Sequence, residues 1–111
     1  NYIAYLFATV AGVSKVGSYT GNGTSQNIDC GFSGNARFVL IKNASQSDNW
    51  MVYDSVRGIN SGTEGYLRLN TTAAEYTSGD HIDPYSGGFA PTSNDPSTNR
   101  TGNTYIFYAI A

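Results

Sequence analysis

Several kinds of residue are scarce in this 111-residue chain, and each scarcity excludes a class of protein. A single cysteine, Cys30, excludes an intrachain disulfide, so the domain is expected to be held by packing or by association with neighbours. Charged residues make up only 13% of the chain, and the six basic ones are scattered. This excludes the basic patch of a nucleic-acid-binding protein. The longest apolar run, residues 2–8, is too short to cross a bilayer, so we expect no membrane partner.

Aromatic residues and glycine are abundant, and they indicate the fold class. The chain has nine Tyr and thirteen Gly, and aromatic residues make up 14% of it. Residues suited to a pleated sheet alternate with turn-forming residues, and no window shows the apolar period of a helix. We therefore predict one all-β domain, an antiparallel, jelly-roll-like β-sandwich of about seven or eight short strands.

The expected strands follow from alternation and from the turn residues between them. The Asn-Gly pair in "TGNGTS" predicts a tight hairpin between residues 16–20 and 25–29. Residues 71–88 are expected to begin with one helical turn or an irregular edge strand. The loops 79–88 and 90–102 are expected to be exposed and to project outward. The remaining strands are expected at residues 37–42, 49–56, 66–70, near Phe89 and at 103–111.

The two ends of the chain resemble each other. Three explanations remain open: two strands in similar environments, a tandem array with a period of about 100 residues, or a strand exchanged between subunits. We expect residues 1–11 to form a boundary strand shared with, or docking on, a neighbouring module or subunit, and residues 12–111 to form the sandwich module. The matching pairs are Tyr2/Tyr105, Ile3/Ile106, Tyr5/Tyr108 and Ala8/Ala111. The predicted assembly contacts are Tyr2, Ile3, Tyr5, Phe7, Tyr105, Ile106 and Tyr108.

An ordered set of motifs carries a family resemblance. The set is "GSYTGNGTSQNIDCGF", "ARFVLIKNASQSDNWMVYDSVRGI", "YLRLNTTAAEYT", "IDPYSGGF" and "NTYIFYAIA". It resembles a domain of uncharacterised function that recurs in structural proteins of tailed bacteriophages, often in tail fibres or other virion-surface proteins. The resemblance extends from Val13 to Ala111. It implies a β-sandwich in long, sometimes repetitive proteins and supplies no catalytic residues.

Few residues are candidates for catalysis or metal binding. His81 has Asp80 and Asp83 beside it, but the sequence indicates no nucleophile near it, so we expect a solvated side chain and no enzyme activity. Asp80, Asp83, Asn94 and Asp95 have oxygen atoms suited to Ca²⁺, but no Ca²⁺-binding loop motif is present. We expect ordinary turn residues there, no metal and no cofactor. Cys30 is expected to be a small, partly buried apolar residue.

The aromatic side chains suggest a different class of function, sugar binding. Tyr76 and Tyr85 lie in turn-rich segments, and with Asp83 they form the predicted ligand contacts, by ring stacking and polar orientation. Trp50 is expected in the core, and Arg57 is expected to pair with Asp54 at the "DSVRG" corner.

These expectations lead to one predicted function and one alternative. The first is a non-enzymatic structural module of a phage virion-surface protein, a tail fibre or similar, which assembles edge to edge or as a tandem array. Its partners would be copies of itself or neighbouring modules of the same protein. The alternative is a carbohydrate-binding module that attaches to a host-surface glycan.

Overall fold

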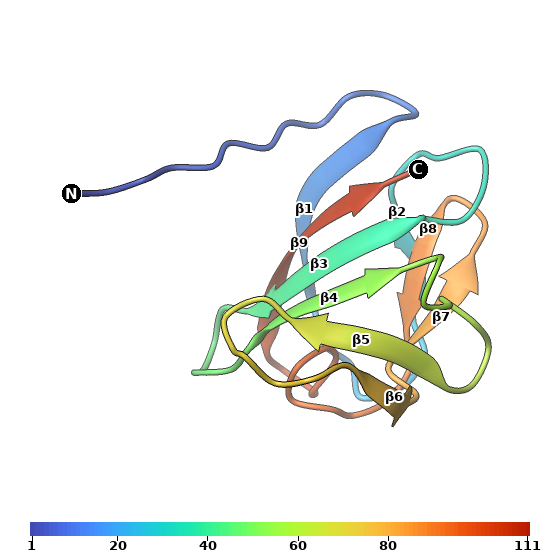
Figure 1. Ribbon diagram of the computed structural model, residues 1–111. Coiled ribbons are helices and arrows are strands. Elements are labelled where there is room, and N and C mark those ends of the chain that lie inside the picture. Colours follow the sequence, from blue (N-terminus) through green and yellow to red (C-terminus); the bar gives the residue numbers. More distant parts are fainter.

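In the computed structural model, which describes residues 1–111, nine strands form two antiparallel β-sheets (Figure 1). The large sheet has the order β1-β9-β3-β4-β5-β6 and the small sheet the order β2-β8-β7. The strands are β1 (Ser14–Thr20), β2 (Ile28–Asp29), β3 (Phe38–Asn43), β4 (Trp50–Asp54), β5 (Glu64–Arg68), β6 (Tyr76–Gly79), β7 (Ile82–Tyr85), β8 (Gly88–Pro91) and β9 (Thr104–Ile110). The expected all-β sandwich is confirmed. The structure contains no helix with the length and apolar character needed to span a membrane.

The core lies between the two sheets. Alternate residues of β3, such as Val39 and Ile41, point inward and are fully buried. Phe89 of the small sheet meets Phe107 of the large one edge to face, with ring centroids 5.2 Å apart. Ile82 of β7 is fully buried in the same cluster. The period-2 pattern of the sequence therefore fills one interior with aromatic and aliphatic side chains from both sheets.

The closing strand β9 lies in the middle of the large sheet, paired with β1 on one side and β3 on the other. Tyr105 points inward, is fully buried and stacks on Tyr19, with centroids 5.1 Å apart. Ile106 points outward and is 44% exposed. Tyr105 is therefore a core residue, and its expected role as an assembly contact is wrong, because no partner can reach its ring.

The predicted hairpin at "TGNGTS" is wrong, because the strands on either side of it belong to different sheets: β1 pairs with β9, and β2 pairs with β8. The glycines serve another purpose. The N–H of Gly21 donates to the carbonyl of Asn103 (2.8 Å), and that of Gly23 donates to the carbonyl of Asn99 (2.9 Å). A Cβ on Gly21 would lie 2.2 Å from the carbonyl oxygen of Arg100. Glycine here permits two loops to approach each other closely.

The two loops expected to project outward pack against the body instead. Residues 79–88 contain β7, and the polar segment 90–102 includes buried Thr98 and Asn99. The Asn99 side-chain amide donates to the carbonyl of Thr24 (2.7 Å), and that of Asn43 donates to the carbonyl of Pro96 (2.7 Å). Internal hydrogen bonds thus allow a polar segment to be buried. Residues 76–79 form the irregular edge strand β6, with a register shift in its pairing with β5.

Residues 1–9, here called the arm, form no strand in the single chain, so the boundary strand expected over residues 1–11 is not present in one copy. Tyr2, Ile3, Tyr5 and Leu6 are each at least 80% exposed. The base of the arm is fixed to β1, because the Ser14 hydroxyl donates to the carbonyl of Ala8 (2.8 Å). Toward its N-terminus the arm passes over the outward side of the large sheet, where Phe7 stacks on Tyr108, and its first residues extend beyond the body (Figure 1). Its docking on a neighbour stays a prediction.

Candidate functional site

The outward side of the large sheet is apolar. Trp50 lies on this side and is 37% exposed, so the expectation that it belongs to the core is wrong: Met51 and Tyr53 take the inward positions of β4. Both sides of the sheet are apolar because the "FVLI" and "YIFY" runs of β3 and β9 have no polar residue at alternate positions. The outward side chains that define this outer face are Val16, Phe38, Leu40, Trp50, Val52, Ile106 and Tyr108.

The arm and the outer face together line two adjacent apolar grooves. In the smaller groove, of about 210 Å³, Tyr5 and Phe7 of the arm lie opposite Trp50 and Tyr108. The larger, of about 660 Å³, extends past Trp50 to Leu69, which is 66% exposed. The lining of both grooves includes no titratable acid or base other than tyrosine. This surface can therefore bind apolar side chains but offers no acid–base chemistry.

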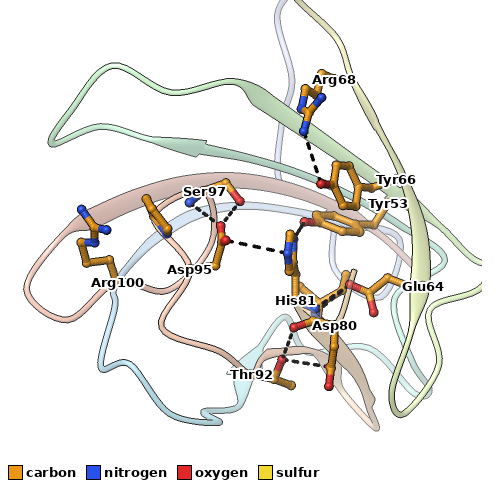
Figure 2. Close-up of polar contacts among 12 residues, drawn as sticks. Tyr53, Glu64, Tyr66, Arg68, Asp80, His81, Thr92, Asp95, Ser97 and Arg100 are labelled. Atoms are coloured by element: carbon orange, nitrogen blue, oxygen red, sulfur yellow. Dashed lines mark hydrogen bonds and ion pairs between the residues drawn. The ribbon is translucent and has the colours of Figure 1, made fainter. Parts of the chain in front are cut away.

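A second feature is polar and centres on His81, between β6 and β7. The Tyr53 hydroxyl hydrogen-bonds to Nδ1 of His81 (3.0 Å), and the Tyr66 ring stacks on the imidazole with centroids 5.1 Å apart. Nε2 of His81 lies 3.8 Å from Oδ2 of Asp95 (Figure 2). The backbone N–H of Ser97 donates to the other Asp95 oxygen (2.8 Å). Strands β4 and β5 and the loop after β8 together position these groups.

This environment sets the protonation state of His81. Burial lowers the pKa of His81, and the nearby Asp95 and Asp80 carboxylates oppose the shift without reversing it. The imidazole is therefore neutral at pH 7. The expectation of a solvated side chain is wrong, because only 15% of the His81 side chain is exposed. The Ser97 hydroxyl donates to Asp95 and not to His81, so these three residues do not form a nucleophile–base–acid chain.

Sequence reasoning missed Glu64, a carboxyl group buried beside His81. Glu64 is 1% exposed, and its Oε1 accepts the backbone N–H groups of His81 (2.7 Å) and Ile82 (3.3 Å). Oε2 is buried without a partner. Burial raises the pKa of Glu64 to about 7, and the nearby acids Asp80 and Asp83 add to the rise. The two backbone hydrogen bonds lower the pKa but do not outweigh burial. The one available signal was alternation, because Glu64 shares the inward side of β5 with Tyr66.

The predicted sugar contacts are not brought together. Tyr76 lies on β6, is 46% exposed and packs on Tyr66, with centroids 5.1 Å apart. Asp83 and Tyr85 lie on β7 of the small sheet, and Asp83 accepts a hydrogen bond from the backbone N–H of Gly62 (3.4 Å). No ring contact joins Tyr76 to Tyr85. The three residues are thus divided between the two sheets, and their role as ligand contacts stays a prediction.

The other candidates have structural surroundings. No group of three or more His, Cys, Asp or Glu side chains is arranged to hold a metal ion. The Asn94 side chain instead accepts a hydrogen bond from the backbone N–H of Thr101 (3.1 Å). Cys30 is buried as expected, and burial raises its pKa to about 11, so it remains a thiol. The expected Asp54–Arg57 ion pair is confirmed.

Comparison with known proteins adds one finding. Residues 1–111 match the model of a family described as a domain of unknown function (DUF7483). The chain belongs to this family. No curated protein and no solved structure matches it. Because the match includes residues 1–9, the arm is part of the DUF7483 domain as the family model defines it.

Proposed function

We propose that this DUF7483 domain is a non-enzymatic structural module that assembles with copies of itself, in the same chain or in neighbouring chains. The observation that carries the proposal is an exposed apolar arm next to an exposed apolar sheet face. Tyr2 and Leu6 of the arm are 103% and 94% exposed, while Trp50 and Ile106 of the outer face are 37% and 44% exposed. A contiguous apolar surface of this kind is typical of an interaction site.

Burial of the arm on another copy would be of the same order as the cost of ordering it. Each large apolar side chain of the arm would contribute about 1.5–3 kcal/mol on full burial. Ordering one backbone residue costs about 1–2 kcal/mol. If alternate arm residues face a partner, each buried side chain accompanies two ordered residues, so association also requires backbone hydrogen bonds to the partner. In the single chain, Phe7 is the one arm residue that makes a ring contact with the sheet.

The edge strand β1 offers the arm of another copy a backbone partner. β1 pairs with β9 on one side only. On its other side, the N–H of Val16 donates to the Thr9 hydroxyl (3.0 Å). From Thr9 toward the N-terminus, the arm departs from the edge of the sheet (Figure 1). Ser14 is paired with Val10, and the carbonyl of Thr20 accepts the side-chain amide of Gln26. Only the middle of the β1 edge, around Ser18, is therefore left to accept an added strand.

The biological setting of this assembly is proposed from the sequence motifs. Their resemblance to phage structural domains supports a place on the virion surface, in a tail fibre or a similar protein. The sequence similarity between the arm and β9 supports an array of repeated modules, because both segments carry the Tyr-Ile-x-Tyr pattern. An isolated copy exposes this pattern in the arm and pairs it in β9.

Self-association of the chain in solution tests the proposal. Sedimentation velocity over a concentration series should show dimers or larger species. Leu6→Asp and Ile106→Lys should each shift the chain to monomer, because each places a charge on one of the two surfaces. Val56→Asp is the matched control, because Val56 is also 94% exposed but lies at the corner after β4. A chain that stays monomeric, or a loss of association equal in the control, would contradict the proposal.

A further inference from the structure

A polar cleft opens beside His81, with a volume of about 200 Å³. It is distinct from the apolar surface proposed for assembly, because it is lined by Asn49, just before β4, and by Tyr66 and Arg68 on the inward side of β5. The loop that follows β8 supplies the opposite wall, with Asp95. The six polar or aromatic residues that the argument uses are Asp48, Asn49, Tyr66, Arg68, His81 and Asp95.

Several side chains in this cleft have hydrogen-bonding capacity that the protein does not use. Arg68 pairs with no carboxylate; its guanidinium lies 5.6 Å from the Tyr66 ring centroid and donates one long bond, 3.4 Å, to the Tyr66 hydroxyl. Nε2 of His81 is 3.8 Å from Asp95 Oδ2, too far for a hydrogen bond. The Arg68 guanidinium thus has unused N–H donors on one side of the cleft, and Asp95 Oδ2, whose nearest partner in Figure 2 is His81, accepts no hydrogen bond on the other.

The charges in the cleft exclude one class of ligand. Arg68 carries one positive charge, whereas Asp48 and Asp95 carry one negative charge each. His81 is neutral because burial lowers its pKa. The cleft therefore has an excess of one negative charge, which disfavours phosphate, sulfate and acidic sugars. A neutral ligand that both donates and accepts hydrogen bonds suits these walls.

Tyr66, which lines the cleft, packs on the exposed ring of Tyr76, which lies outside the lining. Tyr66 contacts both His81 and Tyr76, with centroid distances of 5.1 Å in each case. Tyr66 and His81 are largely covered, but Tyr76 is 46% exposed. Its ring offers an apolar surface to the C–H groups of a sugar, while Arg68, Asp95 and Asn49 of the cleft can form hydrogen bonds with the sugar hydroxyls.

We propose that this cleft binds a single neutral sugar ring, such as the end of a glycan, with Arg68 and Asp95 holding its hydroxyl groups. Tyr76, outside the lining but packed on Tyr66, would contact the C–H groups of the part that projects from the cleft. The volume supports one ring and no longer oligomer, because sites for larger ligands enclose roughly 300–1,000 Å³. The proposal corrects the contact set expected from the sequence: Tyr76 stays, while Asp83 and Tyr85 are replaced by residues of the cleft. It does not depend on self-assembly.

Titration of the whole chain with sugars tests this site. Amide chemical shifts are recorded while glucose, galactose, mannose or N-acetylglucosamine is added to about 50 mM, which reveals dissociation constants in the millimolar range. At least one neutral sugar should shift the amides of Asn49, Arg68 and His81. Arg68→Met should weaken that binding about tenfold or more, because a hydrogen bond from a charged donor is lost. The titrations are repeated in the Leu6→Asp variant, which should not self-associate. Sugar binding that persists in this variant is independent of the proposed assembly.

One control and one further test variant keep the outcome decisive. Arg37→Met removes an exposed arginine that forms no ion pair and should leave binding unchanged, and Tyr76→Ala should weaken it. If Arg68→Met does not fold, Asp48→Asn at the rim replaces it and should also weaken binding. Absence of shifts with every neutral sugar, shifts confined to residues outside the cleft, or binding of inorganic phosphate or sialic acid in place of neutral sugars would each overturn the proposal.

Discussion

The ring of Phe7 lies against the ring of Tyr108, with centroids 4.4 Å apart and 28° between the planes. This stacking joins the arm to the outer face of β9. Phe7 is still 54% exposed, so the contact holds the arm over the sheet without burying it. The pair therefore sets the direction in which the arm leaves the body.

Phe7→Ala is expected to release the arm but leave the fold intact. The lost stacking is worth about 0.5–1.5 kcal/mol, and this energy holds only the arm. Cleavage by chymotrypsin after Tyr2 and Tyr5 should become faster, while the unfolding midpoint in denaturant should hardly change. Tyr2→Ala is the control: Tyr2 is fully exposed, so cleavage after Tyr5 should keep its original rate. A large drop in global stability for Phe7→Ala would show that the arm belongs to the core.

Glu64 is expected to make folding stability depend on pH near neutrality. Its folded pKa of about 7 lies above the ordinary value of 4.5, so the folded state binds a proton that the unfolded state has released. The stability from this group is complete below pH 4.5 and is lost as the pH rises to about 7, by about 3 kcal/mol. Glu64→Gln keeps an acceptor for the N–H groups of His81 and Ile82 but cannot ionise.

The measurement is the free energy of unfolding of both proteins between pH 4.5 and 8. Their difference isolates Glu64, because His81 and the acids Asp80 and Asp83 are common to both. Glu64→Gln should gain stability relative to the parent as the pH rises and should level off above pH 7. A difference that stays constant over this range would show that Glu64 is ionised in the fold.

The sequence predicted the fold class because period-2 alternation is clear in strands such as β4 and β9, where burial of one side enforces it. The partners of those strands were harder to predict. Gly21 and Gly23 look like hairpin glycines, but they serve a close approach to Asn99 and Arg100, which lie nearly eighty residues away. A local turn signal carries no information about such a distant partner.

The same limit applies to the candidate site. Alternation placed Trp50 and Tyr53 on opposite sides of β4 but could not say which side faced the core, because both sides of the large sheet are apolar. His81 lies in a polar stretch that looks exposed, yet Tyr53 and Tyr66 cover it in the fold. The cleft is formed by segments that lie far apart in the sequence, so no local motif reveals it.

Arg57 is expected to stabilise the corner after β4 by a modest amount. Burial alone would raise the pKa of Asp54, but the backbone N–H and guanidinium of Arg57 outweigh it and lower that pKa. Arg57→Ala should cost about 0.5–1 kcal/mol at pH 7, because the pair is partly exposed. The lowered pKa of Asp54 means that the ionised carboxylate is favoured in the folded state, so the pair stabilises the fold only while Asp54 is ionised. The cost of Arg57→Ala should therefore fall as the pH drops through the folded pKa of Asp54. Arg37→Ala, which breaks no ion pair, should change stability little at either pH.

Gly88 is expected to be indispensable to the small sheet. It lies opposite Asp29, where β8 pairs with β2, and a Cβ there would be 2.0 Å from the carbonyl oxygen of Ile28. Because that oxygen belongs to the backbone, the strands would have to separate, and Gly88→Ala should lower the free energy of unfolding by about 2–3 kcal/mol.

Gly34→Ala is the control, because a Cβ on Gly34 meets nothing within 4 Å. It should leave stability unchanged or raise it by up to about 1 kcal/mol, through the smaller entropy of the unfolded chain. Denaturant unfolding of both variants measures the contrast, and equal stabilities would mean that β2 and β8 do not pack as closely as the structure shows.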